Sequence, residues 1–370
     1  MIHSSRLTDK FIELTKIDSP SLKEREMADR LIRELKNLGC SVWEDNAGEK
    51  INGNAGNIYA FLPGTEGEPL VFSGHMDTVD PAFGKKAQVH PDGTITSSGD
   101  TVLGADDVSG IAIILEALTS IQEDSLPHRP LEILFTVAEE PYDRGSEVFD
   151  YARIQSKEAY VLDLSGTVGG AAYAAPAILS FCVEVKGKSS HAGFAPEQGV
   201  HAIAAAADAV SHLQMGHIDS ETTLNIGTIT GGTATNIIPD CCVIKGEIRS
   251  YSNSRAETVF QSVIDNFAAS AASYGAEYEV QGRLGCQAYE LPENHSVIQR
   301  YKNACEKAGI EASLFKTFGG SDASNFSKHG IASLVIANAM FDIHSCNEYT
   351  VAADMAKVAQ AVHHMMLGVD

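Results

Sequence analysis

The sequence has few basic residues: its 370 residues include 27 Lys and Arg against 49 Asp and Glu, a formal net charge of −22 at pH 7. Nucleic acids and anionic membranes bind basic surfaces, so this balance argues against both as partners. No stretch of 18 apolar residues occurs, and the N-terminus leads into a polar helix instead of an apolar signal segment. We therefore expect a cytoplasmic protein with no membrane span.

The sequence also lacks paired cysteines. Its seven cysteines are an odd number, and no two show the C-x-x-C spacing of a structural zinc site or a redox motif. Reduced, mostly buried thiols in a cytosolic protein are the simplest account. Hydrophobic residues make up 44% of the chain and charged residues 21%, close to the globular average, which excludes wholesale disorder and a fibrous fold.

Several catalytic signatures are absent or incomplete. There is no H-E-x-x-H sequence, and Gly187-Lys188-Ser189 ends like a phosphate-binding loop but has Cys182 at the required first glycine. The segment 319–323 half-matches a nucleophile elbow and lacks its final glycine. A metal-independent serine hydrolase that uses Ser321 is therefore a distant alternative.

Strand and helix patterns alternate through most of the chain. Short apolar runs bounded by Gly, Pro or polar residues predict strands, and a run that is apolar almost all round predicts a buried helix at 108–118. Between residues 176 and 293 the order becomes β-α-β-β-α-β. We predict a catalytic α/β domain (1–175 and 294–370) with a mixed, largely parallel sheet flanked by helices, and an inserted α+β sandwich (176–293).

His75 and Asp77 end a predicted strand in the sequence Ser-Gly-His-Met-Asp-Thr. Residues two apart on an extended chain share a face, so the imidazole and the carboxylate point the same way. That arrangement suits a metal-ligating histidine whose other ring nitrogen is held by a carboxylate. A strand-end turn with solvated polar groups is the alternative interpretation.

Further carboxylates and a histidine lie at the ends of other predicted strands and at the start of a predicted helix. Asp106 and Asp107 precede an apolar helix, where a helix cap alone would also account for them. Glu139 and Glu140 follow a predicted buried strand. Two adjacent carboxylates at such a place are costly unless a positive group pairs with them. One of the two could ligate a metal while the other accepts and donates protons. The other candidates are Asp163, inside or at the end of a strand, and a late histidine. These candidates are Asp106, Asp107, Glu139, Glu140, Asp163 and His344.

The combined set suits a pair of metal ions. Five of these candidates, two histidines and three carboxylates, would be enough to hold two zinc ions that share one carboxylate. They lie at the ends of α/β elements, where such sheets bind ligands. A non-catalytic protein that kept the fold would be expected to lack a ligand or the base, and none is missing from this chain.

With these motifs in order, the sequence resembles the co-catalytic zinc peptidases that include peptidase T, aminoacylase and succinyl-diaminopimelate desuccinylase. The resemblance covers essentially the whole chain in one order, and the Gly-Ala-Asp-Asp form and the His-x-x-x-Glu ending at 344–348 are most similar to the peptidase T branch. The matching motifs lie at residues 73–78, 104–107, 139–140, 163, 186–191, 235–239, 319–322 and 344.

The resemblance implies a role for each matching residue. Asp106 would bridge two Zn²⁺ ions, with Co²⁺ or Mn²⁺ as substitutes. His75 and Asp163 would complete one metal site, and Glu140 and His344 the other. Asp77 would orient His75, and Glu139 would be the general base toward a metal-bridging water. The residues implied in substrate binding are His191, Asn236, Arg249, Gly319, Gly320 and Ser321.

The family resemblance implies a dizinc aminopeptidase that acts on short peptides, most specifically a tripeptidase. It also implies a homodimer formed through the inserted domain, which in relatives acts as a lid and pairs the subunits. A dipeptidase or an N-acyl amino acid deacylase of the same family is the alternative. The sequence departs from the usual family pattern at Val108, at Ala192 and over 141–144, and none of these positions is a proposed ligand.

Overall fold

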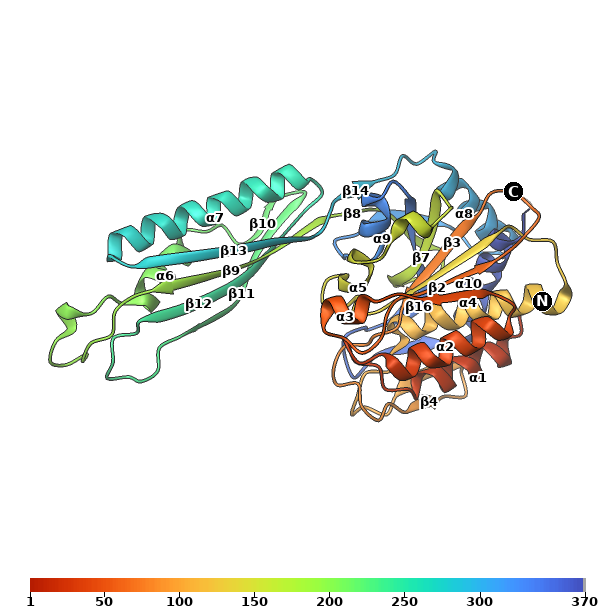
Figure 1. Ribbon diagram of the computed structural model, residues 1–370, viewed down its shortest axis with the longest axis horizontal. Helices are drawn as coiled ribbons and strands as arrows, with labels where there is room; N and C mark the ends of the chain where they lie inside the picture. The colour runs from red at the N-terminus through yellow and green to blue at the C-terminus, as the bar shows by residue number, and fades with distance from the viewer. Residues whose placement is uncertain (369–370) are drawn as a thin grey trace. The chain divides into compact units, whose positions relative to one another are not determined.

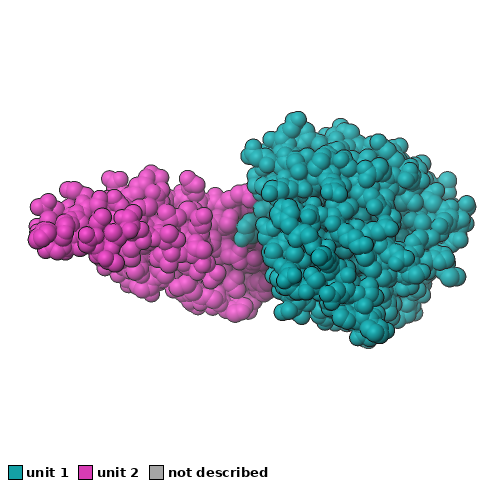
Figure 2. Space-filling view, turned by 90° about the horizontal axis from the view of Figure 1, so that it is seen from below, with its two compact units in different colours: residues 1–174, 290–317, 321–370 teal, residues 175–289, 318–320 magenta. Residues whose placement is uncertain are grey.

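A computed structural model describes residues 1–368 of the chain, which divide into two units (Figure 2). Unit 1 consists of Met1–Ala174, Glu290–Thr317 and Ser321–Asp370, and unit 2 of Ala175–Tyr289 and Phe318–Gly320. Residues 369 and 370, which end the predicted catalytic domain, lie outside the described residues. Among the described residues, no helix is both long and apolar enough to cross a membrane.

Unit 1 is built on a mixed sheet whose main path runs β1-β2-β6-β3-β7-β16-β17-β5-β4, with β8 pairing to β15 and β16 (Figure 1). The strands are β1 (Ser41–Glu44), β2 (Ile58–Leu62), β3 (Leu70–His75), β4 (Ala87–Val89), β5 (Thr94–Ser97), β6 (Leu131–Thr136), β7 (Glu158–Ser165), β8 (Gly170–Ala175), β14 (Tyr289–Glu290), β15 (Ser313–Lys316), β16 (Ala332–Phe341) and β17 (Tyr349–Val351).

The centre of this sheet is parallel. Strand β3 pairs in parallel with β6 and β7, and β7 pairs in parallel with β16. Every residue of β3 and β6 is buried, as expected for strands covered on both faces. The margins are antiparallel: β1 with β2, β2 with β6, β16 with β17, β17 with β5, and β4 with β5. The predicted fold class is confirmed, and the parallel centre brings the carboxyl ends of four strands to one edge.

Helices cover the sheet of unit 1. They are α1 (Ser4–Thr15), α2 (Arg25–Asn37), α3 (Ala47–Ile51), α4 (Ala105–Asp124), α5 (Arg144–Glu147), α8 (Ser296–Lys307), α9 (Ala323–Lys328) and α10 (Ala352–Met366), with a 3₁₀ turn at Tyr151–Arg153. Helix α4 is buried on nearly all sides, as its sequence predicted, because it lies against β3, β7 and β16 and also packs on α1 and α10. Its first turn is irregular at Asp106 and Asp107, whose backbone angles are not helical.

Unit 2 is an antiparallel sheet in the order β10-β11-β12-β9-β13, against which α6 and α7 pack side by side. The elements are β9 (Ala177–Lys186), α6 (Ala202–Ser211), β10 (Gly216–Asp219), β11 (Thr222–Gly231), β12 (Cys241–Ser250), α7 (Asn253–Tyr274) and β13 (Glu277–Cys286), with a 3₁₀ turn at Pro196–Gln198. Alternate residues of β9, such as Val183 and Val185, are buried in its core. The predicted β-α-β-β-α-β order is present, with the short β10 added.

Candidate metal centre

Four neighbouring strand ends and the start of α4 supply the polar side chains of one cluster in unit 1. His75 is the last residue of β3, and Glu139 and Glu140 follow β6. Asp163 lies near the end of β7, and His344 follows β16. Because these strands are parallel, residues far apart in the sequence meet at the same edge of the sheet, where α/β proteins bind ligands.

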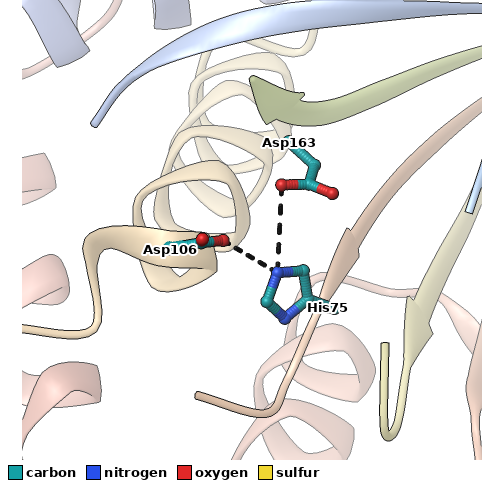
Figure 3. Close-up of side chains that lie close together, drawn as sticks. All are labelled: His75, Asp106 and Asp163. Carbon is teal, nitrogen blue, oxygen red and sulfur yellow. Dashed lines mark hydrogen bonds and ion pairs between the residues drawn. The ribbon is translucent and has the colours of Figure 1, made fainter. Parts of the chain in front are cut away.

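His75, Asp106 and Asp163 form the first group of possible metal ligands (Figure 3). The Nε2 atom of His75 lies 2.9 Å from Oδ1 of Asp106 and 3.9 Å from Oδ1 of Asp163. Figure 3 shows the two carboxylates converging on this nitrogen from α4 and β7. The ligand atoms of the three residues all lie within 4.8 Å of one another.

Asp106, Glu140 and His344 form the second group. The Nε2 atom of His344 lies 3.1 Å from Oδ2 of Asp106 and 3.0 Å from Oε2 of Glu140. The two oxygens of Asp106 therefore face different histidines, and Asp106 belongs to both groups. A carboxylate with this placement is suited to bridge two cations.

The donor set fits divalent cations. Imidazole and carboxylate are ligands of zinc and related metals. The Oε1 atom of Glu140 is buried and accepts no hydrogen bond, so one possible ligand oxygen of the second group has no partner within the protein. A buried polar atom without a partner is costly, and a bound cation would satisfy it.

The protonation of the cluster reflects crowded carboxylates. Burial, followed by the charge of Asp106, raises the pKa of Asp163 well above its ordinary value. Burial and the charge of Asp163 do the same to the pKa of Glu139. For His75, burial opposes the charged form, but hydrogen bonds to Asp106 and Asp77, together with the charges of Glu139 and Asp106, outweigh burial and raise the pKa of the imidazole. Cations at this position would relieve the repulsion among the carboxylates.

Asp77 organises both sides of the centre from a fully buried position. Its Oδ1 accepts a hydrogen bond from the backbone N–H of Glu139 at 3.0 Å and lies 3.4 Å from Nδ1 of His75. Its Oδ2 accepts hydrogen bonds from Ser21 Oγ at 2.6 Å and from the backbone N–H of Glu140 at 3.3 Å. The residue thus holds the imidazole on one strand end and the acidic pair on the next.

Asp107 and Glu348 are buried carboxylates whose structural roles the sequence did not indicate. Asp107 accepts hydrogen bonds from the backbone N–H of His75 at 3.0 Å and from Nδ2 of Asn338 at 2.6 Å. Glu348 accepts hydrogen bonds from the backbone N–H groups of Gly104 and Asp106. The adjacent Asp106-Asp107 pair and the His-x-x-x-Glu ending were visible signals, but their partners are remote in sequence.

The residues predicted to bind substrate lie in both units. His191 and Asn236 of unit 2 come from adjoining segments, since His191 pairs with Ile237 and the backbone N–H of Ala192 donates to the carbonyl of Asn236. Arg249 is held by both carboxylate oxygens of Glu247 and donates to the carbonyl of Phe318 at 2.6 Å. Gly319 and Gly320 belong to unit 2, whereas Ser321 is a buried residue of unit 1.

An α/β sheet with a carboxylate–histidine cluster at its carboxyl edge, interrupted by a second α+β unit, defines a two-unit metallohydrolase. Comparison with known proteins is consistent with this class. Residues 173–275 match the family described as Peptidase dimerisation domain, and residues 57–174 match Peptidase family M28.

Relatives that span the whole chain narrow the assignment. An uncharacterised protein, YqjE of Bacillus subtilis (strain 168), is 35% identical over 363 residues, which cover 98% of each chain. Aminopeptidase PepT from Bacillus cereus ATCC 10987 is 36% identical, with 99% of each chain covered and a TM-score of 0.90. A tripeptidase from Staphylococcus aureus Mu50 is 33% identical, covers 99% of this chain and 98% of its own, and has a TM-score of 0.95. The chain belongs to the peptidase T-like branch of the M20 metallopeptidase family.

Proposed function

We propose that this protein is a zinc-dependent aminopeptidase that removes the N-terminal residue of short peptides, with tripeptides as its substrates. The observation that carries the proposal is the pair of ligand groups sharing Asp106, with the carboxylate of Glu139 beside them at 4.0 Å from Nε2 of His75. The tripeptidase and the aminopeptidase among its relatives support the substrate class.

The chain's own residues divide the work of hydrolysis. His75, Asp106 and Asp163 would hold one cation, and Asp106, Glu140 and His344 the other. Bound divalent cations polarise a scissile carbonyl and lower the pKa of water. Glu139 accepts the proton of the attacking water and delivers it to the leaving amine, as a general base and then a general acid. Through its contacts with Nδ1 of His75 and the backbone N–H of Glu139, Asp77 fixes the positions of both residues during this proton transfer.

Substrate binding and assembly are further parts of the proposal. His191, Asn236, Arg249 and the segment 319–321 would align the peptide, which lowers the entropic cost of the reaction. The description matched by residues 173–275 supports a homodimer formed through unit 2. A cytoplasmic location stays a prediction from the unpaired cysteines.

A substrate screen combined with metal removal tests the proposed function. Purified protein would be offered dipeptides, tripeptides with free or acetylated N-termini, and N-acyl amino acids, with product identity read by mass spectrometry. We expect release of the N-terminal residue from free tripeptides. Activity should disappear after exhaustive chelation and return with Zn²⁺.

Each other outcome would point elsewhere. Activity that survives complete metal removal would contradict the metallopeptidase mechanism and favour a nucleophile such as Ser321. Exclusive cleavage of N-acyl amino acids would make the protein a deacylase, and exclusive cleavage of dipeptides a dipeptidase. Release of the C-terminal residue would contradict an aminopeptidase. Metal content measured on the protein as purified would identify the native ion.

A further inference from the structure

Glu348 makes an unusual pair of contacts with the loop that carries the shared ligand. The residue is 1% exposed, and its two carboxylate oxygens accept hydrogen bonds from the backbone N–H groups of Gly104 at 2.7 Å and of Asp106 at 2.9 Å. A carboxylate far along the chain thus receives both N–H groups on either side of Ala105. The N-cap residue of α4, Gly104, has no side chain and provides no such acceptor.

The loop needs an external support because its backbone is irregular. Gly104 has a φ of +80°, and Asp106 and Asp107 have non-helical backbone angles before α4 continues. The first N–H groups of a helix have no partner within the helix and must find one elsewhere. Glu348 supplies it, so the orientation of the Asp106 side chain depends on a residue that follows β16.

The segment that carries His344 also depends on Glu348. His344 is half exposed, with a φ of +61°, and Asp342 before it also has a positive φ. Among the described residues 342–348, only Glu348 is buried. Its buried side chain therefore fixes the segment 342–348, from which the imidazole of His344 contacts Asp106 and Glu140.

We propose that Glu348 is a positioning residue that sets the cation affinity of the second ligand group: Asp106, Glu140 and His344. It fastens the backbone of Asp106 to the segment of His344, so that the two side chains meet around one cation. The first group keeps His75 and Asp163, which Asp77 and the strand pairing of β3 and β7 hold independently. This inference rests on the proposed function only in taking both groups as cation sites.

Metal titration of a matched pair of variants tests the inference. Glu132 is a suitable control, because it is also fully buried and its two oxygens accept backbone N–H groups, those of Gln155 at 2.9 Å and Ser156 at 2.8 Å. Metal-free wild type, Glu348→Gln and Glu132→Gln would be titrated with Co²⁺, and binding followed by absorbance and calorimetry.

We expect the wild type to bind two cations per chain. Glu348→Gln should bind the second cation at least tenfold more weakly and the first much less so, because His75 and Asp163 still hold the first, whereas Glu132→Gln should bind both as the wild type does. Glu348→Asp, which keeps the charge on a side chain one methylene shorter, replaces Glu348→Gln if that variant does not fold. It should also weaken the second cation selectively.

Any of three results would overturn the inference. One is wild-type affinity for both cations in a folded Glu348 variant. The second is equal weakening of both cations, and the third is the same weakening in Glu132→Gln. Either of these would reduce Glu348 to a general structural role. Failure of the wild type to cleave peptides with two cations bound would contradict the proposed function alone and leave the role of Glu348 intact.

Discussion

The carboxylate of Asp107 accepts a hydrogen bond from the backbone N–H of His75, 32 positions away in the sequence, at 3.0 Å. Its other oxygen accepts a hydrogen bond from Nδ2 of Asn338 in β16 at 2.6 Å. Asp107 itself lies at the start of α4 and is fully buried. One side chain therefore joins the end of β3, the start of α4 and strand β16 directly behind the ligand cluster.

Replacing Asp107 by alanine should destabilise unit 1 even without metal. The substitution leaves the backbone N–H of His75 without its acceptor and leaves Nδ2 of Asn338 with only its 3.1 Å hydrogen bond to Ser109 Oγ. An unsatisfied buried donor costs about 1–3 kcal/mol. The measurement is urea unfolding in the presence of a chelator, followed by fluorescence of the single tryptophan, Trp43, which lies in β1 and so reports on unit 1. Asp9→Ala, an exposed aspartate of α1, is the control. An unchanged midpoint for Asp107→Ala would show that its two hydrogen bonds do not stabilise the unit.

Gly74 should not tolerate a side chain while Asp107 is present. A Cβ atom at Gly74 would lie 2.5 Å from Oδ2 of Asp107, and such overpacking of a buried position costs about 1–3 kcal/mol. We expect Gly74→Ala to lower the unfolding midpoint of unit 1. Gly53→Ala, whose Cβ meets ordinary contacts of 3.5 Å or more, should be nearly neutral. The cost of Gly74→Ala should shrink in the Asp107→Ala background, because the clashing oxygen is then gone.

Glu139→Gln should abolish most turnover and leave the metal in place. General acid–base catalysis contributes about 10²–10⁴-fold to rate, so kcat is expected to fall by that order. Metal content by elemental mass spectrometry should match the wild type, because Glu139 belongs to neither ligand group. Glu132→Gln, a buried carboxylate of β6 that supports a remote turn, should retain activity. Loss of metal from Glu139→Gln would show that Glu139 is a metal ligand and that another residue is the general base.

The residues that the structure brings together in the two groups could be picked out as candidates because their signals in the sequence are local. His75, Glu140 and Asp163 sit where buried strands end, and parallel strands bring such ends together without any need to know the pairing partners. By contrast, Asp107 and Glu348 act on backbone groups of distant residues, and no sequence pattern identifies those partners.

The same reasoning explains the incomplete prediction of the fold. The central strands were visible as short, mostly apolar runs bounded by Gly, Pro or polar residues, and helix α4 was visible because most of its residues are apolar. Marginal strands such as β4 and β17 contain three residues each, too few for an alternating pattern to stand out. Strand β17 also pairs with β5, which is far away in the sequence, and no local pattern indicates that pairing.

His363 should make the metal-free protein less stable at mildly acidic pH. Burial, together with the nearby His364 and the N-terminal amine and opposed by Asp124, lowers the pKa of its imidazole to about 4, whereas the unfolded chain has the ordinary value of 6.5. Between these values the unfolded state binds a proton and the folded state does not, so stability falls as the pH falls from 6.5 toward 4.

Variants of His363 test whether its imidazole causes this loss of stability at acidic pH. The loss of melting temperature between pH 7 and pH 5 should be smaller in His363→Gln than in the wild type, because the titrating group is gone. The exposed His90 in the turn before β5 provides a control, and His90→Gln should lose as much as the wild type. A steeper loss in His363→Gln would contradict the assignment.

Ile229 lies on a strand edge suited to association of two chains. Strand β10 pairs only with residues Thr222 to Leu224 of β11, and along the rest of β11 no strand of the described residues covers that edge. Ile229 is 52% exposed on this stretch, and open edges pair readily with a second chain. We expect Ile229→Lys to shift the proposed dimer toward monomer in sedimentation analysis. Val89→Lys, equally exposed in unit 1, should not, and an unaffected dimer in Ile229→Lys would exclude this edge.

The ligands of the centre come from both sides of unit 2 in the sequence. His75, Asp106, Glu140 and Asp163 precede it, whereas His344 and its anchor Glu348 follow it, on the segment after β16. A chain emerging from the ribosome therefore exposes four ligands long before the fifth is made, and domains fold as their segments become available. A cation in the second group could be held only after unit 2 and β16 have been synthesised. The order of the residues thus delays full activity of this peptidase until unit 2 and the segment that follows β16 have been made.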